Sequence, residues 1–147
     1  MPIEVKYLDA GKGVVLTASG IVTGEDFIEA SNEIFSRDLA AEPYLYAVVD
    51  FDGSNGTNIS TSQLREIANR DLLASRYLPK GVVGIYANND LPFALARIWQ
   101  ILVESSGWET RIFRSRPEAV SWVKQRVVDK FGVRASLEQY SATEAVQ

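Results

Sequence analysis

The 147-residue sequence contains neither histidine nor cysteine. These two absences exclude a thiolate nucleophile and any catalytic triad that uses histidine as its base. They also exclude structural zinc, haem held by His or Cys, and iron–sulfur clusters, because these groups need His or Cys ligands. Without cysteine, disulfide bonds give no information about the compartment. Carboxylate chemistry assisted by a metal ion is the main enzymatic route that this composition leaves open.

Positive charge is also scarce, since 15 basic residues stand against 19 acidic ones and the net charge is −4. This balance argues against a nucleic-acid partner, because phosphate backbones are bound by basic patches. No apolar run approaches 18 residues, so we expect no membrane span. The first residues lack the charged start and apolar stretch of a secretory signal. We therefore expect a soluble, cytoplasmic protein of one domain.

Short apolar segments alternate with longer amphipathic ones along the chain. The pattern predicts strands at residues 3–8, 14–19, 44–50, 81–87 and 109–113. Helices are predicted at about 24–38, 60–78, 90–106 and 115–131, with caps at Thr23, Ser60 and Ser115. This order predicts an α/β fold with a five-stranded, mostly parallel sheet, an N-terminal antiparallel hairpin and four helices. Residues 1–133 would form the domain and residues 134–147 a polar C-terminal tail.

Four segments at the joints of this pattern resemble the STAS superfamily and, within it, the SpoIIAA-like proteins. They are residues 20–26 (GIVTGED), 48–50 (VVD), 81–85 (GVVGI) and 112–123 (IFRSRPEAVSWV). The last segment is the most specific, because it is similar to the family's strand, Phe-Arg, helix and Trp pattern. The resemblance covers about residues 3–130 and implies a SpoIIAA-like sheet with helices packed on it and no catalytic machinery.

The resemblance also implies two modes of action, both through binding. In anti-sigma-factor antagonists of the superfamily, phosphorylation of a Ser at the start of the second helix switches binding to a regulatory protein partner. The equivalent residues here are 58–62 (NISTS), with Ser60 as the candidate phosphoacceptor, although the Asp and Gly of the family's Asp-Ser-Ser-Gly setting are absent. Ser60 is equally explained as a helix cap contributing about 1 kcal/mol. Other SpoIIAA-like proteins are suspected of holding apolar ligands.

An alternative is a Mg²⁺-dependent phosphohydrolase that uses Asp50-Phe51-Asp52-Gly53. This turn resembles the first motif of haloacid-dehalogenase-type phosphatases, in which the first Asp attacks phosphorus and the second is a general acid and base. Lys80 and Asp90 would then supply the cation and the later acidic ligand. The order of motifs disagrees, because no strand is left between the turn and Lys80 for the family's second motif.

The segment 91–104 is apolar around most of its helical circumference. A helical wheel places its polar strip at Arg97, Gln100 and Glu104, and its core face at Leu91, Leu95, Ile98 and Leu102. Phe93, Trp99 and Val103 then flank that face. Such an excess of apolar surface predicts a homodimer contact, a partner surface or the wall of an apolar pocket, or else a deeply buried core helix.

One carboxyl group falls on a helix face that should be buried. Asp71 shares its face with Ile67, Ala68 and Ala74. A buried carboxylate needs a partner or a raised pKa. Asp71 could orient a polar group of a ligand, or a neighbouring hydroxyl or Arg could satisfy it.

These observations favour a non-enzymatic module that binds a regulatory protein partner or a small apolar ligand, with a homodimer as one arrangement. We expect no cofactor and no metal. The predicted binding surface comprises Asp50, Asp52, Ser60, Ser62, Phe93, Trp99 and Val103.

Overall fold

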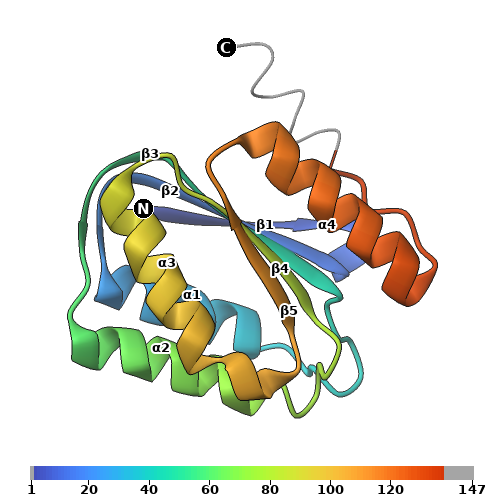
Figure 1. Ribbon diagram of the computed structural model, residues 1–147. Coiled ribbons are helices and arrows are strands. Elements are labelled where there is room, and N and C mark those ends of the chain that lie inside the picture. The colour runs from blue at the N-terminus through green and yellow to red at the C-terminus, as the bar shows by residue number, and fades with distance from the viewer. Residues whose placement is uncertain (1, 138–147) are drawn as a thin grey trace.

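The computed structural model describes residues 2–137 and contains one five-stranded sheet (Figure 1). Its strands are β1 (Ile3–Leu8), β2 (Gly13–Thr23), β3 (Tyr46–Asn58), β4 (Val82–Tyr86) and β5 (Glu109–Phe113). They lie in chain order, with β1 antiparallel to β2 and all later neighbours parallel. The predicted α/β architecture and N-terminal hairpin are confirmed. Parallel neighbours require a crossover between successive strands, and helices provide it.

Strands β2 and β3 are longer than the sequence predicted. Residues 51–58, which we expected in a loop, continue β3 and pair with the end of β2, up to Thr23 opposite Asn58. The Gly, Ser and Asn residues here are typical of turns. They are nevertheless extended, because they pair with the end of β2. Strand β4 pairs with β3 only as far as Asp50, so β2 and β3 form a two-stranded ribbon beyond it. The register of this ribbon shifts between Thr17 and Ser19, as at a β-bulge.

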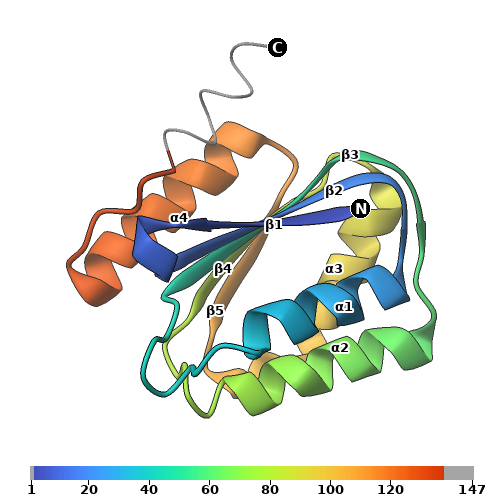
Figure 2. The same cartoon turned by 180° about the vertical axis from the view of Figure 1, so that it is seen from behind.

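Four α-helices cover the two faces of the sheet (Figure 2). The helices α1 (Gly24–Phe35), α2 (Thr61–Ala74) and α3 (Asp90–Leu102) lie on one face, and α4 (Arg116–Phe131) covers the other. No helix in the described part of the chain is long and apolar enough to cross a membrane.

Side-chain caps begin three of these helices where the sequence predicted them. Thr23 and Ser60 each accept a hydrogen bond from the backbone N–H three residues later, and each forms a reciprocal capping box. Ser115 accepts one from the N–H of Glu118 at 3.5 Å. Each cap satisfies a backbone donor that the helix itself leaves free, so the start of the helix is fixed locally.

The core is divided by the sheet into two layers. The larger cluster lies under α1, α2 and α3, and the smaller one lies under α4. Ala135 and Leu137 are buried in the smaller cluster, so residues 134–137 of the predicted tail pack against the domain. The Ser136 N–H also donates to Asp9 at 3.0 Å. Our prediction of a tail for residues 138–147 lies outside the described residues.

Candidate functional site

Strand β3 directs its side chains alternately to the two layers, and this alternation separates two candidate sites. Ala47, Val49 and Phe51 face the layer under α1, α2 and α3 and line a cavity there. Tyr46 and Val48 belong to the cluster under α4. Because successive residues of a strand point to opposite faces, Asp50 lies on the same side as α4 rather than in the cavity.

The first site is an ion-pair network where β3 and β4 meet the start of α4. Arg116 Nη2 lies 2.8 Å from Asp50 Oδ2 and 3.3 Å from Asp52 Oδ2. The Tyr86 hydroxyl donates to Asp52 Oδ1 at 3.3 Å. Burial first, and the charge of Asp52 second, raise the pKa of Tyr86. Arg116 thus pairs with two carboxylates at once.

This geometry does not favour the phosphohydrolase alternative. Asp50, which would attack phosphorus, is only 1% exposed and is paired with Arg116. Lys80 precedes β4, so it lies at the opposite end of the parallel strands from Asp50. Asp90 pairs with Arg114 at 2.9 Å. No cluster of three or more acidic side chains suited to a metal ion occurs among residues 2–137.

Ser60 and Ser62 are both exposed at the start of α2. The Ser60 hydroxyl accepts from the Gln63 N–H at 3.1 Å, and the Gln63 side chain accepts from the Ser60 N–H at 3.0 Å. Ser60 therefore acts as a helix cap, while its role as a phosphoacceptor stays a prediction.

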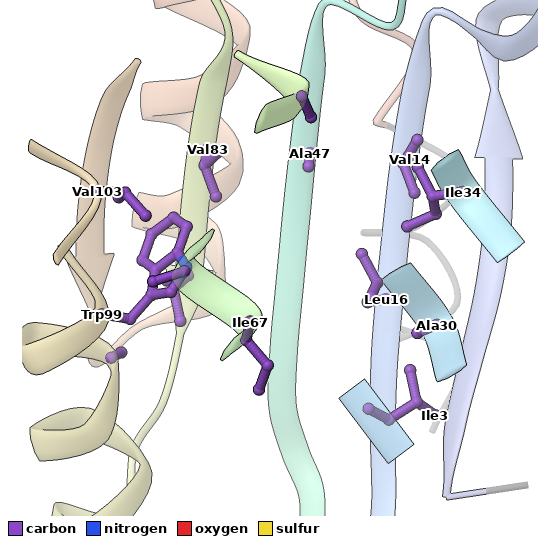
Figure 3. Close-up of a cluster of buried hydrophobic side chains, with 14 of the residues drawn as sticks. Ile3, Val14, Leu16, Ala30, Ile34, Ala47, Ile67, Val83, Trp99 and Val103 are labelled. Atoms are coloured by element: carbon purple, nitrogen blue, oxygen red, sulfur yellow. The ribbon is translucent and has the colours of Figure 1, made fainter. Parts of the chain in front are cut away.

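The second site is an apolar cavity of about 120 Å³ between the sheet and helices α1, α2 and α3. Its walls come from all three helices and from β2, β3 and β4. Figure 3 shows sheet and helix side chains facing one another across this layer, among them Val14, Leu16, Val83, Ile34, Ile67 and Trp99. Three polar side chains reach the lining, namely Ser31, Tyr44 and Asp71. The cavity is thus an apolar space with a few polar groups, which is the usual composition of a ligand site.

Asp71 lines this cavity from α2, on the face where the sequence placed it. Its Oδ2 accepts a hydrogen bond from Trp99 Nε1 at 2.8 Å. Burial raises the pKa of Asp71 to about 7, and the hydrogen bond from Trp99 lowers it by less. The partner is therefore an indole, rather than the hydroxyl or Arg that we expected. This carboxyl group can change its protonation state near neutral pH.

The orientation of α3 differs from the helical wheel. Trp99 is 9% exposed and Val103 1%, whereas Leu91 and Ile98 are 54% and 48% exposed. Trp99 and Val103 therefore do not lie on an exposed surface, but Trp99 lines the cavity, which is the apolar pocket wall that the sequence offered as one alternative. Our prediction that Leu91 and Ile98 form the core face is wrong. Hydrogen bonds from two side chains fix the rotation, from Trp99 to Asp71 and from Gln100 to the carbonyl and hydroxyl oxygens of Thr110 on β5. An apolar pattern that runs nearly all round a helix cannot determine its rotation.

The other residues that we predicted for the binding surface also differ in how exposed they are. Asp50 is buried, so our expectation that it faces a partner is also wrong. Phe93 is half-buried, and the Arg114 guanidinium lies 4.2 Å from its ring centre. Asp52, Ser60 and Ser62 are exposed. Sequence reasoning placed Tyr44 at the start of the third strand but did not name it as a site residue, whereas the structure has it buried in the segment before β3 and lining the cavity.

These features define an α/β domain with helices on both faces of a mixed sheet and an apolar cavity on one side. Two solved structures share this architecture. An uncharacterized DUF3478-family protein with a SpoIIAA-like fold from Shewanella loihica PV-4 matches with a TM-score of 0.54 and 19% identity. The match covers 82% of this chain and 91% of that one. The anti-sigma factor antagonist SpoIIAA in its unphosphorylated form matches with a TM-score of 0.51 and 12% identity, over 82% and 96% of the chains.

The chain therefore has a SpoIIAA-like fold, as its sequence motifs predicted. At these identities the likeness concerns the fold alone. No protein-family model matches the sequence, and no curated protein matches it.

Proposed function

We propose that this protein is a non-catalytic binding module that holds a small apolar ligand in the cavity under α1, α2 and α3. The cavity itself carries this proposal, because its volume is about 120 Å³ and nearly all of its lining is apolar. An engineered cavity of about 150 Å³ in another protein stays dry and binds benzene. The expected ligand is therefore of about that size. A cytoplasmic location remains part of the proposal.

The energetics of packing support this reading of the cavity. Protein interiors are close-packed, and voids larger than a water molecule are few. An unfilled volume of 120 Å³ costs about 3 kcal/mol at about 24 cal/mol per Å³. Small residues such as Ala96 and Ala47 maintain the space, although a larger apolar residue would fill it. A cost of this size is offset when a ligand occupies the cavity.

Filling the cavity should abolish ligand binding. We expect toluene to raise the melting temperature of the wild type by several degrees, because it binds only the folded state. Ala96→Leu should remove this increase, since Ala96 is buried and lines the cavity. Ala41→Leu is the matched control, because Ala41 is exposed and does not line the cavity, so its variant should respond like the wild type. Thermal unfolding by circular dichroism measures both responses.

Two outcomes of this experiment would contradict the proposal. One is a wild type whose melting temperature does not respond to toluene, and the other is an equal response in Ala96→Leu. If Ala96→Leu does not fold, Ser31→Val tests the same cavity from α1, because Ser31 is buried in its lining. Native mass spectrometry of the purified wild type would add a direct test through the mass of any ligand it retains.

A second candidate function is contact with a protein partner, which the exposed face of α3 favours. Leu91, Ala94, Ile98 and Ile101 are all exposed and follow the 3-4-3 spacing of a coiled-coil seam. Arg97 and Glu104 flank this seam, seven residues apart, and neither forms an ion pair within residues 2–137. We therefore propose a second copy of this chain as the partner at α3.

A charge in the seam should prevent this homodimer. We expect native mass spectrometry to show a wild-type dimer and an Ile101→Glu monomer, because the buried carboxylate would face an apolar partner surface. Val128→Glu is the control, since Val128 is 48% exposed on α4, far from the seam. A monomeric wild type, or a dimer that Ile101→Glu leaves intact, would argue against this surface. Asp52, Ser60 and Ser62 remain the proposed surface for a regulatory protein partner.

A further inference from the structure

We propose that the ligand of the cavity is a small uncharged molecule with an apolar body and one hydroxyl group, bound with that group toward Asp71 and Tyr44. This inference rests on the proposed ligand-binding function and specifies the chemistry of the ligand. Phenol is a simple representative of the class.

The polar side chains of the lining have hydrogen-bonding capacity that the protein does not use. Trp99 occupies only Oδ2 of Asp71, and no described residue donates to Oδ1. The Tyr44 hydroxyl also has no hydrogen-bond partner among residues 2–137, although the residue is only 6% exposed. Asp71 is half-buried, and neither its Oδ1 nor the Tyr44 hydroxyl is among the fully buried unpaired atoms of the described residues, so both are accessible to a water or ligand molecule. A ligand that displaces water here has to replace the hydrogen bonds of that water. A ligand that donates to Asp71 and accepts from Tyr44 would satisfy both.

Tyr44 and Asp71 line the same cavity, Tyr44 from the segment before β3 and Asp71 from α2. Burial first, and the charge of Asp71 second, raise the pKa of Tyr44. The rest of the lining is apolar apart from Ser31, whose hydroxyl also has no hydrogen-bond partner within the described residues. A ligand in this cavity therefore meets few polar groups, Asp71 and Tyr44 among them.

The charges around Asp71 disfavour an acidic ligand. Among the cavity-lining residues, Asp71 is the only charged side chain. Arg37 interacts with Tyr44 but does not line the cavity, because it donates to the carbonyls of Gly11 and Glu42. A carboxylate ligand would therefore meet a second carboxyl group with no cation among the lining residues, and would also lose its hydration. Toluene, phenol and benzoate are of similar size, but toluene has no polar group, phenol has a hydroxyl group and benzoate has a negative charge.

The test compares the affinities of these three probes for the full chain. Binding can be followed by tryptophan fluorescence, because Trp99 and Trp108 line the cavity. The measured quantity is the ratio of the toluene Kd to the phenol Kd. We expect Asp71→Leu, which removes the acceptor at similar size, to lower this ratio at least about tenfold. Tyr44→Phe should lower it severalfold, and benzoate should bind the wild type much more weakly than phenol.

Each outcome separates this inference from the proposed function. If toluene binds but the ratio is unchanged in both Asp71→Leu and Tyr44→Phe, the cavity holds ligands and our assignment of their polar group is wrong. Benzoate binding as tight as that of phenol would also overturn it. If none of the three probes binds the wild type, the proposed function fails as well. Tyr44→Phe loses only a hydroxyl group and keeps the test decisive if Asp71→Leu does not fold.

Discussion

Replacing Arg116 with methionine is expected to lower the free energy of unfolding by about 3–5 kcal/mol at pH 7. Asp50 is 1% exposed and Arg116 12%, and their charged atoms are 2.8 Å apart. Removing the guanidinium would leave the Asp50 carboxylate in a buried position without its counter-charge. Urea denaturation gives the measurement. Because methionine keeps most of the aliphatic volume, the loss reports on charge rather than packing.

Two further variants test this explanation. Arg114→Met removes an equivalent side chain two residues earlier, but its ion pair with Asp90 is largely exposed, so we expect a change within about 0.5 kcal/mol. Adding Asp50→Asn to Arg116→Met should recover at least half of the lost stability. The amide removes the buried charge and still accepts the hydrogen bond from the Asp52 N–H. Equal losses in Arg114→Met and Arg116→Met would contradict the prediction.

Replacing Asp71 with asparagine is expected to stabilise the protein at pH 8 by up to about 4 kcal/mol and to have almost no effect at pH 4. Burial raises the pKa of this carboxyl group from its ordinary value of 3.8 to about 7 in the folded state. Between these values the folded state keeps a proton that the unfolded state has released, so stability falls as pH rises and levels off above pH 7. Three pH units correspond to about 4 kcal/mol.

The measurement is urea denaturation of wild type and Asp71→Asn at several pH values from 4 to 8. The difference in unfolding free energy should grow with pH in favour of the variant. Glu66→Gln is the control on the same helix, because Glu66 is exposed and its ion pair with Arg70 is on the surface. Its difference from the wild type should stay within about 0.5 kcal/mol. Parallel pH profiles for wild type and Asp71→Asn would show that burial does not perturb this group.

A protein that keeps this carboxyl group in its core gives up stability above neutral pH. The cavity gives up stability too, because its lining atoms lack partners on one side. Both costs fall on the same layer, under α1, α2 and α3, while the layer under α4 holds apolar side chains such as Val48 and Val123 and a buried carboxylate, Asp50, that Arg116 pairs. This difference between the two layers is what the proposed ligand site explains.

Local patterns predicted most of the secondary structure correctly. Hydroxyl caps begin three of the helices, at Thr23, Ser60 and Ser115, and could be predicted because the hydrogen bond spans only three residues. The alternation of strands and helices likewise limited the topology to a mostly parallel sheet. The wheel of α2 placed Asp71 on its buried face, since the polar residues of that helix are numerous enough to define its exposed side.

The sequence by itself therefore determined the element order, the helix starts and the SpoIIAA-like fold. Only the tertiary structure decided the rotation of α3, the partner of Asp50 and the existence of a cavity. Each of these depends on residues far apart in the chain: Trp99 on Asp71, Arg116 on Asp50, and the cavity on walls from three helices and three strands. Periodicity and spacing describe only near neighbours in the chain, so they cannot show which distant groups meet or where packing leaves space.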